Sequence, residues 1–221
     1  MRSFDQIFAI AADRKGGAEA LNAMLSPPKP ASELATIADD RWLAAMTRCV
    51  FQAGFNWKVV ESMWPGFETA FDGFDIGRCA MLSDEDFERL VSDKRIIRNG
   101  AKIKSVQENA AFVQALAAEY GSAGKAVASW PSTDFIGLLE LFRKRGSRLG
   151  GATAQYCLRS MGKDSFILSQ SVNDRLIAEG VIDKPATSRK AMSDVQAAFN
   201  VWMEQSGRSL TEISRVLAMS L

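Results

Sequence analysis

The segment from Ile96 to Ile103 has residue types and spacing that can bind a phosphate. It reads IIRNGAKI, a short turn between two expected helices, and includes Arg98, Asn99, Gly100 and Lys102. Gly100 has no Cβ to keep backbone N–H groups away from a phosphate oxygen, and Lys102 would add a positive charge. We therefore interpret residues 83–120 as a helix-hairpin-helix. An Asn-Gly step before a helix is also a common turn, so the motif alone is weak evidence.

Basic residues are concentrated locally, although the formal net charge is only +1. A nucleic acid partner would therefore need a local basic surface. The sequence offers two such clusters, which comprise Lys94, Arg95, Arg98, Lys102 and Lys104 in one and Arg143, Lys144, Arg145 and Arg148 in the other. Each cluster alone is also typical of a solvated helix face.

Histidine is absent, and there are only three cysteines. These facts exclude Ser-His-Asp and Cys-His catalysis and every zinc site that uses histidine. Cys49, Cys79 and Cys157 are far apart and odd in number, so buried free thiols are expected. We expect no metal and no cofactor.

Apolar residues recur at helical spacing through nearly the whole chain, and no segment alternates as a strand does. The expected class is all-α. The expected helices cover residues 3–25, 40–53, 56–63, 66–71, 83–91, 101–120, 133–144, 152–161, 169–179, 187–204 and 209–220. Residues 121–131 and 180–185 are candidate hinges, both too short to be linkers between independent domains. We therefore expect a single domain over residues 1–221.

The apolar runs are shorter than the roughly 20 residues that a membrane span needs. The first residues lack the apolar core and cleavage site of a secretory signal. The sequence therefore indicates a cytoplasmic protein with no membrane association, and we expect a monomer.

Several segments together resemble the DNA-3-methyladenine glycosylase I family. These segments are FQAGFNW at 51–57, FDGFD at 71–75, Leu90-Val91, IIRNGAKI at 96–103, KRG at 144–146, and Gly151, Thr153 and Tyr156. The resemblance covers roughly residues 50–160. It implies an all-α, two-lobed helix-hairpin-helix glycosylase fold with a lesion pocket in a cleft between lobes. The implied activity is hydrolysis of the N-glycosidic bond of a damaged base flipped out of double-stranded DNA.

The resemblance also implies roles for individual residues. Trp57 falls on the tryptophan that stacks on the lesion base, and Phe8 on an aromatic near the pocket. Tyr156 lies on the helix after Gly150-Gly151, whose N-terminal amides could face phosphate, although close packing is the alternative. Arg148 and Gly151 therefore join the expected DNA-backbone contacts.

Important family positions are changed. The glutamate that reads the methylated base falls on Cys49, and the zinc-ligand histidine falls on Ala12. An aspartate of the wider superfamily falls on Ser169, which carries no full charge. Asp164 is our preferred catalytic candidate, with a helix cap or surface ion pair as the alternative.

Two functions remain open. One is a base-excision glycosylase that removes cationic N-alkylated purines such as 3-methyladenine or 7-methylguanine, which leave easily because they are already charged. The other is a noncatalytic DNA-binding or lesion-sensing protein on the same fold. Both predict a lesion-base pocket that includes Trp57, Cys49, Phe8, Tyr156 and Ser169.

Overall fold

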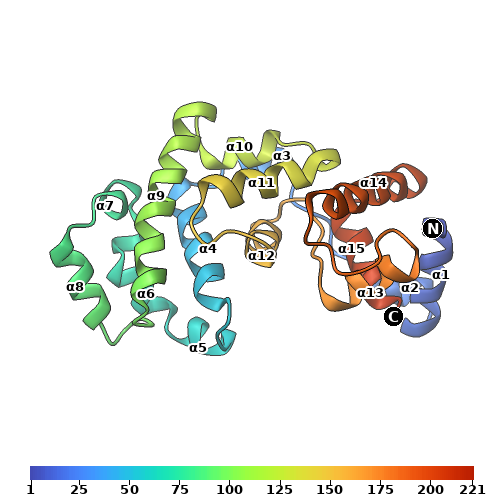
Figure 1. Cartoon of the computed structure of the whole chain (residues 1–221), viewed down its shortest axis with the longest axis horizontal. Coiled ribbons are helices and arrows are strands. Elements are labelled where there is room, and N and C mark those ends of the chain that lie inside the picture. Colours follow the sequence, from blue (N-terminus) through green and yellow to red (C-terminus); the bar gives the residue numbers. More distant parts are fainter. The chain divides into compact units, whose positions relative to one another are not determined.

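A computed structural model describes residues 1–221 as fifteen α-helices and two short 3-10 helices, with no strand (Figure 1). The all-α expectation is confirmed. The α-helices are α1 Phe4–Lys15, α2 Ala18–Ala23, α3 Ala31–Ala35, α4 Asp39–Gln52, α5 Trp57–Ser62, α6 Trp64–Ala70, α7 Ile76–Ala80, α8 Asp84–Ser92, α9 Gly100–Tyr120, α10 Ala123–Ser129, α11 Phe135–Arg145, α12 Ala152–Ser160, α13 Gln170–Ala178, α14 Arg189–Ser206 and α15 Leu210–Met219.

The chain divides into two compact units. The first contains Met1–Lys29, Trp130–Leu138 and Gly162–Leu221, and the second contains Pro30–Ser129 and Leu139–Met161. The expected cleft between lobes and the single-domain boundary stay predictions.

The core of the second unit is built on α4 and α9, which lie side by side (Figure 1). In α9 the buried residues Ile103, Val106, Ala110 and Val113 recur every three or four positions, so they form one apolar stripe. Each large apolar side chain buried in this way stabilises the fold by about 1.5–3 kcal/mol. Helix α12 also packs against α4, which brings residues from both helices to one site.

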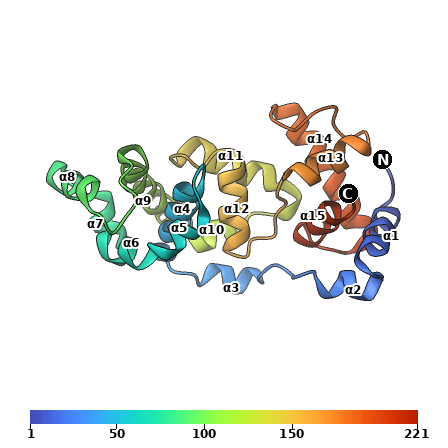
Figure 2. The same ribbon diagram turned by 90° about the horizontal axis from the view of Figure 1, so that it is seen from below.

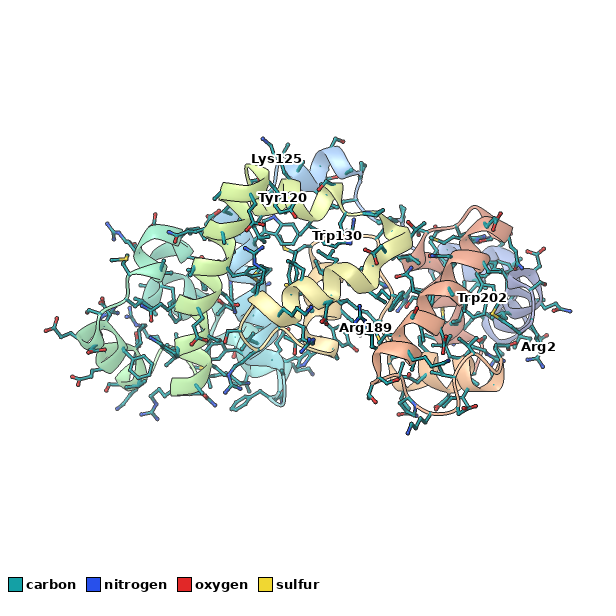
Figure 3. The ribbon with its side chains drawn as sticks, turned by 45° about the horizontal axis from the view of Figure 1, so that its top comes forward. Arg2, Tyr120, Lys125, Trp130, Arg189 and Trp202 are labelled. Atoms are coloured by element: carbon teal, nitrogen blue, oxygen red, sulfur yellow. The ribbon has the colours of Figure 1, made fainter.

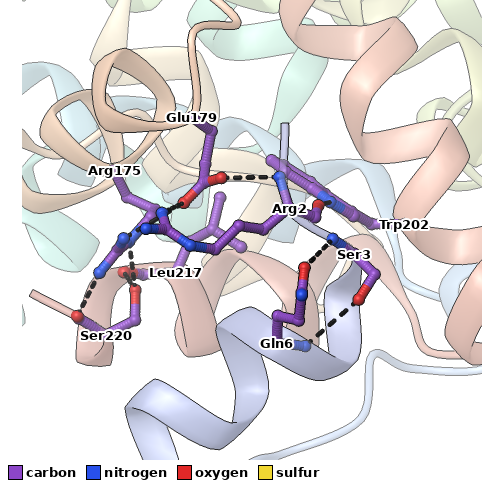
Figure 4. A network of polar contacts seen from close by, with 8 residues as sticks. All are labelled: Arg2, Ser3, Gln6, Arg175, Glu179, Trp202, Leu217 and Ser220. Atoms are coloured by element: carbon purple, nitrogen blue, oxygen red, sulfur yellow. Dashed lines mark hydrogen bonds and ion pairs between the residues drawn. The ribbon is translucent and has the colours of Figure 1, made fainter.

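In the first unit α1 packs against α15, and the two chain ends lie in this unit (Figure 2). A buried polar network holds them there (Figure 4). Glu179 accepts from the backbone N–H and the guanidinium of Arg2, both at 2.8 Å, and from Arg175. Arg175 in turn donates to the Ser220 hydroxyl at 2.8 Å. The paired charges compensate one another's desolvation.

Aromatic side chains mark the interior and the edge of these units (Figure 3). Trp202 projects from α14 into the packed helices of the first unit and is fully buried. Its indole N–H donates to the Arg2 carbonyl at 3.2 Å. Tyr120, at the end of α9, is exposed. No helix is both long enough and apolar enough to cross a lipid bilayer.

Two local expectations are wrong. The first helix is not continuous over residues 3–25, because Gly16 and Gly17 both have positive φ and separate α1 from α2. Residues 121–131 are not a simple hinge, because α10 forms there. Asp39, at the start of α4, accepts the Ala123 N–H at 2.8 Å at the start of α10. That partner comes from a distant part of the sequence.

Candidate functional site

An open cavity of about 550 Å³ lies in the second unit, between the C-terminal end of α4, the start of α5 and the first turns of α12. It is lined by Cys49, Gln52, Ala53, Gly54, Phe55, Asn56, Trp57, Ala152, Thr153 and Tyr156. This set contains aromatic, thiol, amide and hydroxyl groups and no aspartate, glutamate, lysine or arginine. Such a surface suits a flat, polar ring rather than a multiply charged ligand.

Trp57 stands at the edge of this cavity because of the local sequence around it. Gly54 adopts a φ of 71°, which turns the chain after α4. Asn56 then caps α5, since its side chain accepts the Lys58 N–H at 3.0 Å. Trp57 is therefore the first residue of α5 and remains 50% exposed.

Tyr156 meets Trp57 from the opposite wall. The ring centroids are 5.4 Å apart and the ring planes are at 90°, an edge-to-face contact. This contact fixes the indole orientation and leaves the ring half exposed. The structure thus brings together three sequence-predicted pocket residues, Trp57, Tyr156 and Cys49.

Cys49 is 7% exposed and lies on the cavity wall. A hydrogen bond with the Cys157 thiol lowers the pKa of Cys49, and Ser160 and the nearby charge of Arg48 act in the same direction. Contact with Cys49 and complete burial raise the pKa of Cys157. At the position where the family has its base-reading glutamate, this chain therefore has the Cys49 thiol, which ionises more readily than the neighbouring Cys157 thiol.

The loop between α11 and α12 forms a second helix–turn–helix. Its Ser147 peptide is held by buried Asn109, which accepts the Ser147 N–H at 2.7 Å and donates to the Ser147 carbonyl at 3.1 Å. Arg148 has a positive φ of 57°, and Gly151 has φ 55° and ψ −132°. No side chain caps α12, whose first residue Ala152 is exposed beside the cavity, and the Thr153 N–H donates to the Gly150 carbonyl at 3.3 Å.

The contacts of Lys102 favour a structural role, and its expected DNA contact stays a prediction. Lys102 is only 8% exposed, and its ammonium donates to the carbonyls of Phe51 at 3.1 Å and Ala53 at 2.7 Å. These carbonyls belong to the end of α4, where a cation is favourable. Burial lowers the pKa of Lys102, and the positive charge of Arg148 adds to this effect. Lys102 therefore stabilises the site from inside.

The turn around Gly100 is mainly a packing element. A Cβ on Gly100 would lie 3.3 Å from Phe87, and a Cβ on Gly66 would lie 2.2 Å from the Arg95 carbonyl, so the turn packs tightly against α8 and α6. Asn99 caps α9 by accepting the Lys102 N–H at 3.1 Å. Arg98 remains exposed at the surface.

Four of the other eight cations in the two basic clusters form ion pairs. Arg95 binds Asp93, Arg145 binds Glu119, and Arg143 and Lys144 share Glu140. Arg98 and Arg148 form no ion pair within the protein and are both exposed. They are the expected DNA-backbone residues that the geometry leaves available.

Three predicted site residues belong to the first unit, where each has a structural contact. Asp164 accepts the Thr211 N–H at 2.9 Å, in the first turn of α15. Ser169 caps α13 by accepting the Val172 N–H. Phe8 lies 5.0 Å from the Arg208 guanidinium. These contacts favour structural roles, and the chemical roles of these residues stay predictions.

The zinc site implied by the resemblance does not fit the residues present. Ala12, at the histidine position, is buried and offers only a methyl group. No group of three or more cysteine, aspartate or glutamate side chains gathers anywhere as metal ligands. Zn²⁺ requires nitrogen, sulfur or oxygen donors at these positions.

The all-helical fold is similar to that of solved 3-methyladenine DNA glycosylases. A 3-methyladenine DNA glycosylase I in complex with 3-methyladenine gives a TM-score of 0.52 at 16% identity, over 66% of this chain and 85% of that one. A second, from Staphylococcus aureus, gives a TM-score of 0.51 at 18% identity, over 61% and 79%. At such identities the likeness concerns the fold alone.

The sequence comparisons confirm the resemblance to this family. Residues 35–136 match the family model described as methyladenine glycosylase. The chain is 39% identical over 64 residues to DNA-3-methyladenine glycosylase 1 of Escherichia coli (strain K12), which is 28% of this chain and 34% of that protein. The chain thus matches about a third of the length of this curated relative.

Proposed function

We propose that the protein is a DNA glycosylase that flips an N-alkylated purine out of duplex DNA and hydrolyses its N-glycosidic bond. The observation that carries this proposal is the half-exposed Trp57 ring, held edge-to-face by Tyr156 at the mouth of an open, uncharged cavity. An extruded base can stack on the open indole face, since base–aromatic stacking is worth about 1–3 kcal/mol. The names of the matching family and relatives support the same reaction class.

The DNA backbone would be bound beside this cavity. The first turn of α12 lines the cavity, and no side chain caps its N-terminal amides after Gly151. Arg148 is exposed in the loop just before these amides. Amides and a guanidinium together suit a phosphate that flanks an extruded nucleotide.

The chemistry asked of the protein is modest for a cationic lesion. An N-alkylated purine already carries the charge that makes it a good leaving group, so binding and orientation supply much of the catalysis. Water then completes the hydrolysis at the sugar.

A noncatalytic lesion sensor is the second candidate. One observation favours it: the cavity wall contains no aspartate or glutamate that could assist the attacking water. Such a protein would bind flipped bases and abasic sites without bond cleavage.

Base release and abasic-site binding separate these functions. Alkylated duplex DNA is incubated with the protein, and free 3-methyladenine and 7-methylguanine are measured by chromatography. Binding to duplex DNA that carries an abasic-site mimic is measured in parallel. Release above the spontaneous rate supports the glycosylase. Tight binding to the abasic-site mimic without base release supports the sensor. If the protein neither releases a base nor binds the mimic, both candidate functions are contradicted.

A further inference from the structure

Gln52 has a hydrogen-bonding arrangement that suits base recognition. It is the second α4 residue on the cavity wall, one helical turn after Cys49, and is 9% exposed. Its amide Nε2 donates to Glu61 Oε1 at 2.8 Å, outside the cavity lining. Its amide oxygen accepts no hydrogen bond from the protein. An unused carbonyl on the wall of a cavity can receive a donor from a bound ligand.

Glu61 sets which way the Gln52 amide faces. A carboxylate only accepts hydrogen bonds, so it requires the NH₂ end of the amide on its side. If the amide were flipped, two oxygens would face each other at about hydrogen-bond distance. The Arg48 guanidinium lies 3.8 Å from the same Glu61 oxygen and keeps a positive charge beside it. Arg48 is itself held over the Trp64 ring, with its guanidinium carbon 4.1 Å from the ring centroid.

The locked amide has one carbonyl acceptor and one remaining N–H donor. An adenine-type base presents an amino donor next to a ring-nitrogen acceptor, and a glutamine amide pairs with this edge through two hydrogen bonds. A 6-oxo purine presents an oxygen where adenine has its amino group. That oxygen would face the Gln52 carbonyl, so the locked orientation disfavours it.

Building on the proposed function, we propose that Gln52 reads the edge of the extruded base and that Glu61 is a positioning residue that makes the pocket select 6-amino over 6-oxo purines. This assignment gives the recognition of the base to an amide, in a pocket whose wall has no carboxylate. The selectivity depends on a residue that does not touch the base.

The orientation lock can be reversed by one substitution. In Glu61→Lys, an ammonium donor replaces the acceptor, so the Gln52 oxygen should turn toward it and the NH₂ group toward the cavity. Glu61→Leu removes the lock without reversing it. Glu88→Lys is the matched charge control, because Glu88 is exposed on α8 and does not line the cavity.

The test measures binding of two free bases, 3-methyladenine and 3-methylhypoxanthine, by calorimetry on the full chain. They share the methyl group and differ at position 6. The wild type and Glu88→Lys should prefer 3-methyladenine by roughly tenfold, Glu61→Leu by less, and Glu61→Lys should prefer the 6-oxo base, since a bidentate pair discriminates by about this amount. Melting temperatures of all variants verify that they are folded.

Three results would overturn the inference. If the wild type binds both bases equally, or if Glu61→Lys keeps the wild-type preference, Glu61 does not set selectivity, while the glycosylase proposal stands. If the wild type binds neither base and also releases none from alkylated DNA, the proposed function fails with it.

Discussion

Lys102 Nζ donates to the Ala53 carbonyl at 2.7 Å, and this bond connects the start of α9 to the end of α4 beside the cavity. A lysine in a basic turn thus serves as an internal cap. Truncation to alanine would leave the Phe51 and Ala53 carbonyls without their charged donor. Lys102→Ala should therefore lower the free energy of unfolding by about 1.5–3 kcal/mol, the range for hydrogen bonds to a charged group. Urea denaturation measures this loss. An unchanged midpoint would contradict the capping role.

Arg98 is the matched comparison, because it lies in the same turn but is exposed. Arg98→Ala should leave the urea midpoint unchanged. If Arg98 contacts a phosphate, its loss should weaken binding to all DNA sequences and reduce the slope of log affinity against log salt by about 1. Titrations at several salt concentrations provide the slope. A wild-type slope would remove Arg98 from the DNA surface.

Thiol reactivity should follow the environments of the three cysteines. The pKa of Cys49 is lowered by Cys157, and Cys49 lines an open cavity, whereas burial raises the pKa of Cys79 to about 12. Because the thiolate is the nucleophile, Cys49 has the larger reactive fraction at every pH below its pKa. Iodoacetamide should label Cys49 first, as followed by peptide mass spectrometry between about pH 7 and 9. Faster labelling of Cys79 in the folded protein would contradict this account.

Asp164 can be tested with two substitutions of different character. Asn retains an oxygen that can accept the Thr211 N–H, whereas Ala does not. A capping role predicts that Asp164→Asn keeps stability and base release, and that Asp164→Ala loses about 1 kcal/mol of stability. A catalytic role predicts that both variants lose base release. Thermal melting and the release assay together distinguish the two.

Local signals in the sequence predicted much of the helical framework. The Ser83 and Asp86 capping box begins α8, and Gly121, with a φ of 88°, ends α9. These ends depend on hydrogen bonds within one turn, so the local residues are sufficient. Trp57 at the start of a helix could be found in the same way.

Other features depended on partners distant in sequence. Lys102 is buried because its ammonium binds the carbonyls of Phe51 and Ala53, and no local sequence pattern indicates that these carbonyls lie near it. Likewise, the Gln52–Glu61 pair requires the turn between α4 and α5 to place the two side chains together. From the sequence, Lys102 close to Gly100 indicated a phosphate contact. In the folded protein, tertiary packing buries Lys102 as a cap on the C-terminal end of α4.

The measurement that tests the central claim most directly is the paired analysis of Trp57→Ala. Its affinity for duplex DNA with an extruded base and its melting temperature are compared with those of the wild type. Because the ring is 50% exposed, we predict a loss of about 1–3 kcal/mol in binding, with the melting temperature nearly unchanged. A core tryptophan would instead cost about 3–5 kcal/mol of fold stability. A large fall in melting temperature, with wild-type affinity in the folded fraction, would contradict the account.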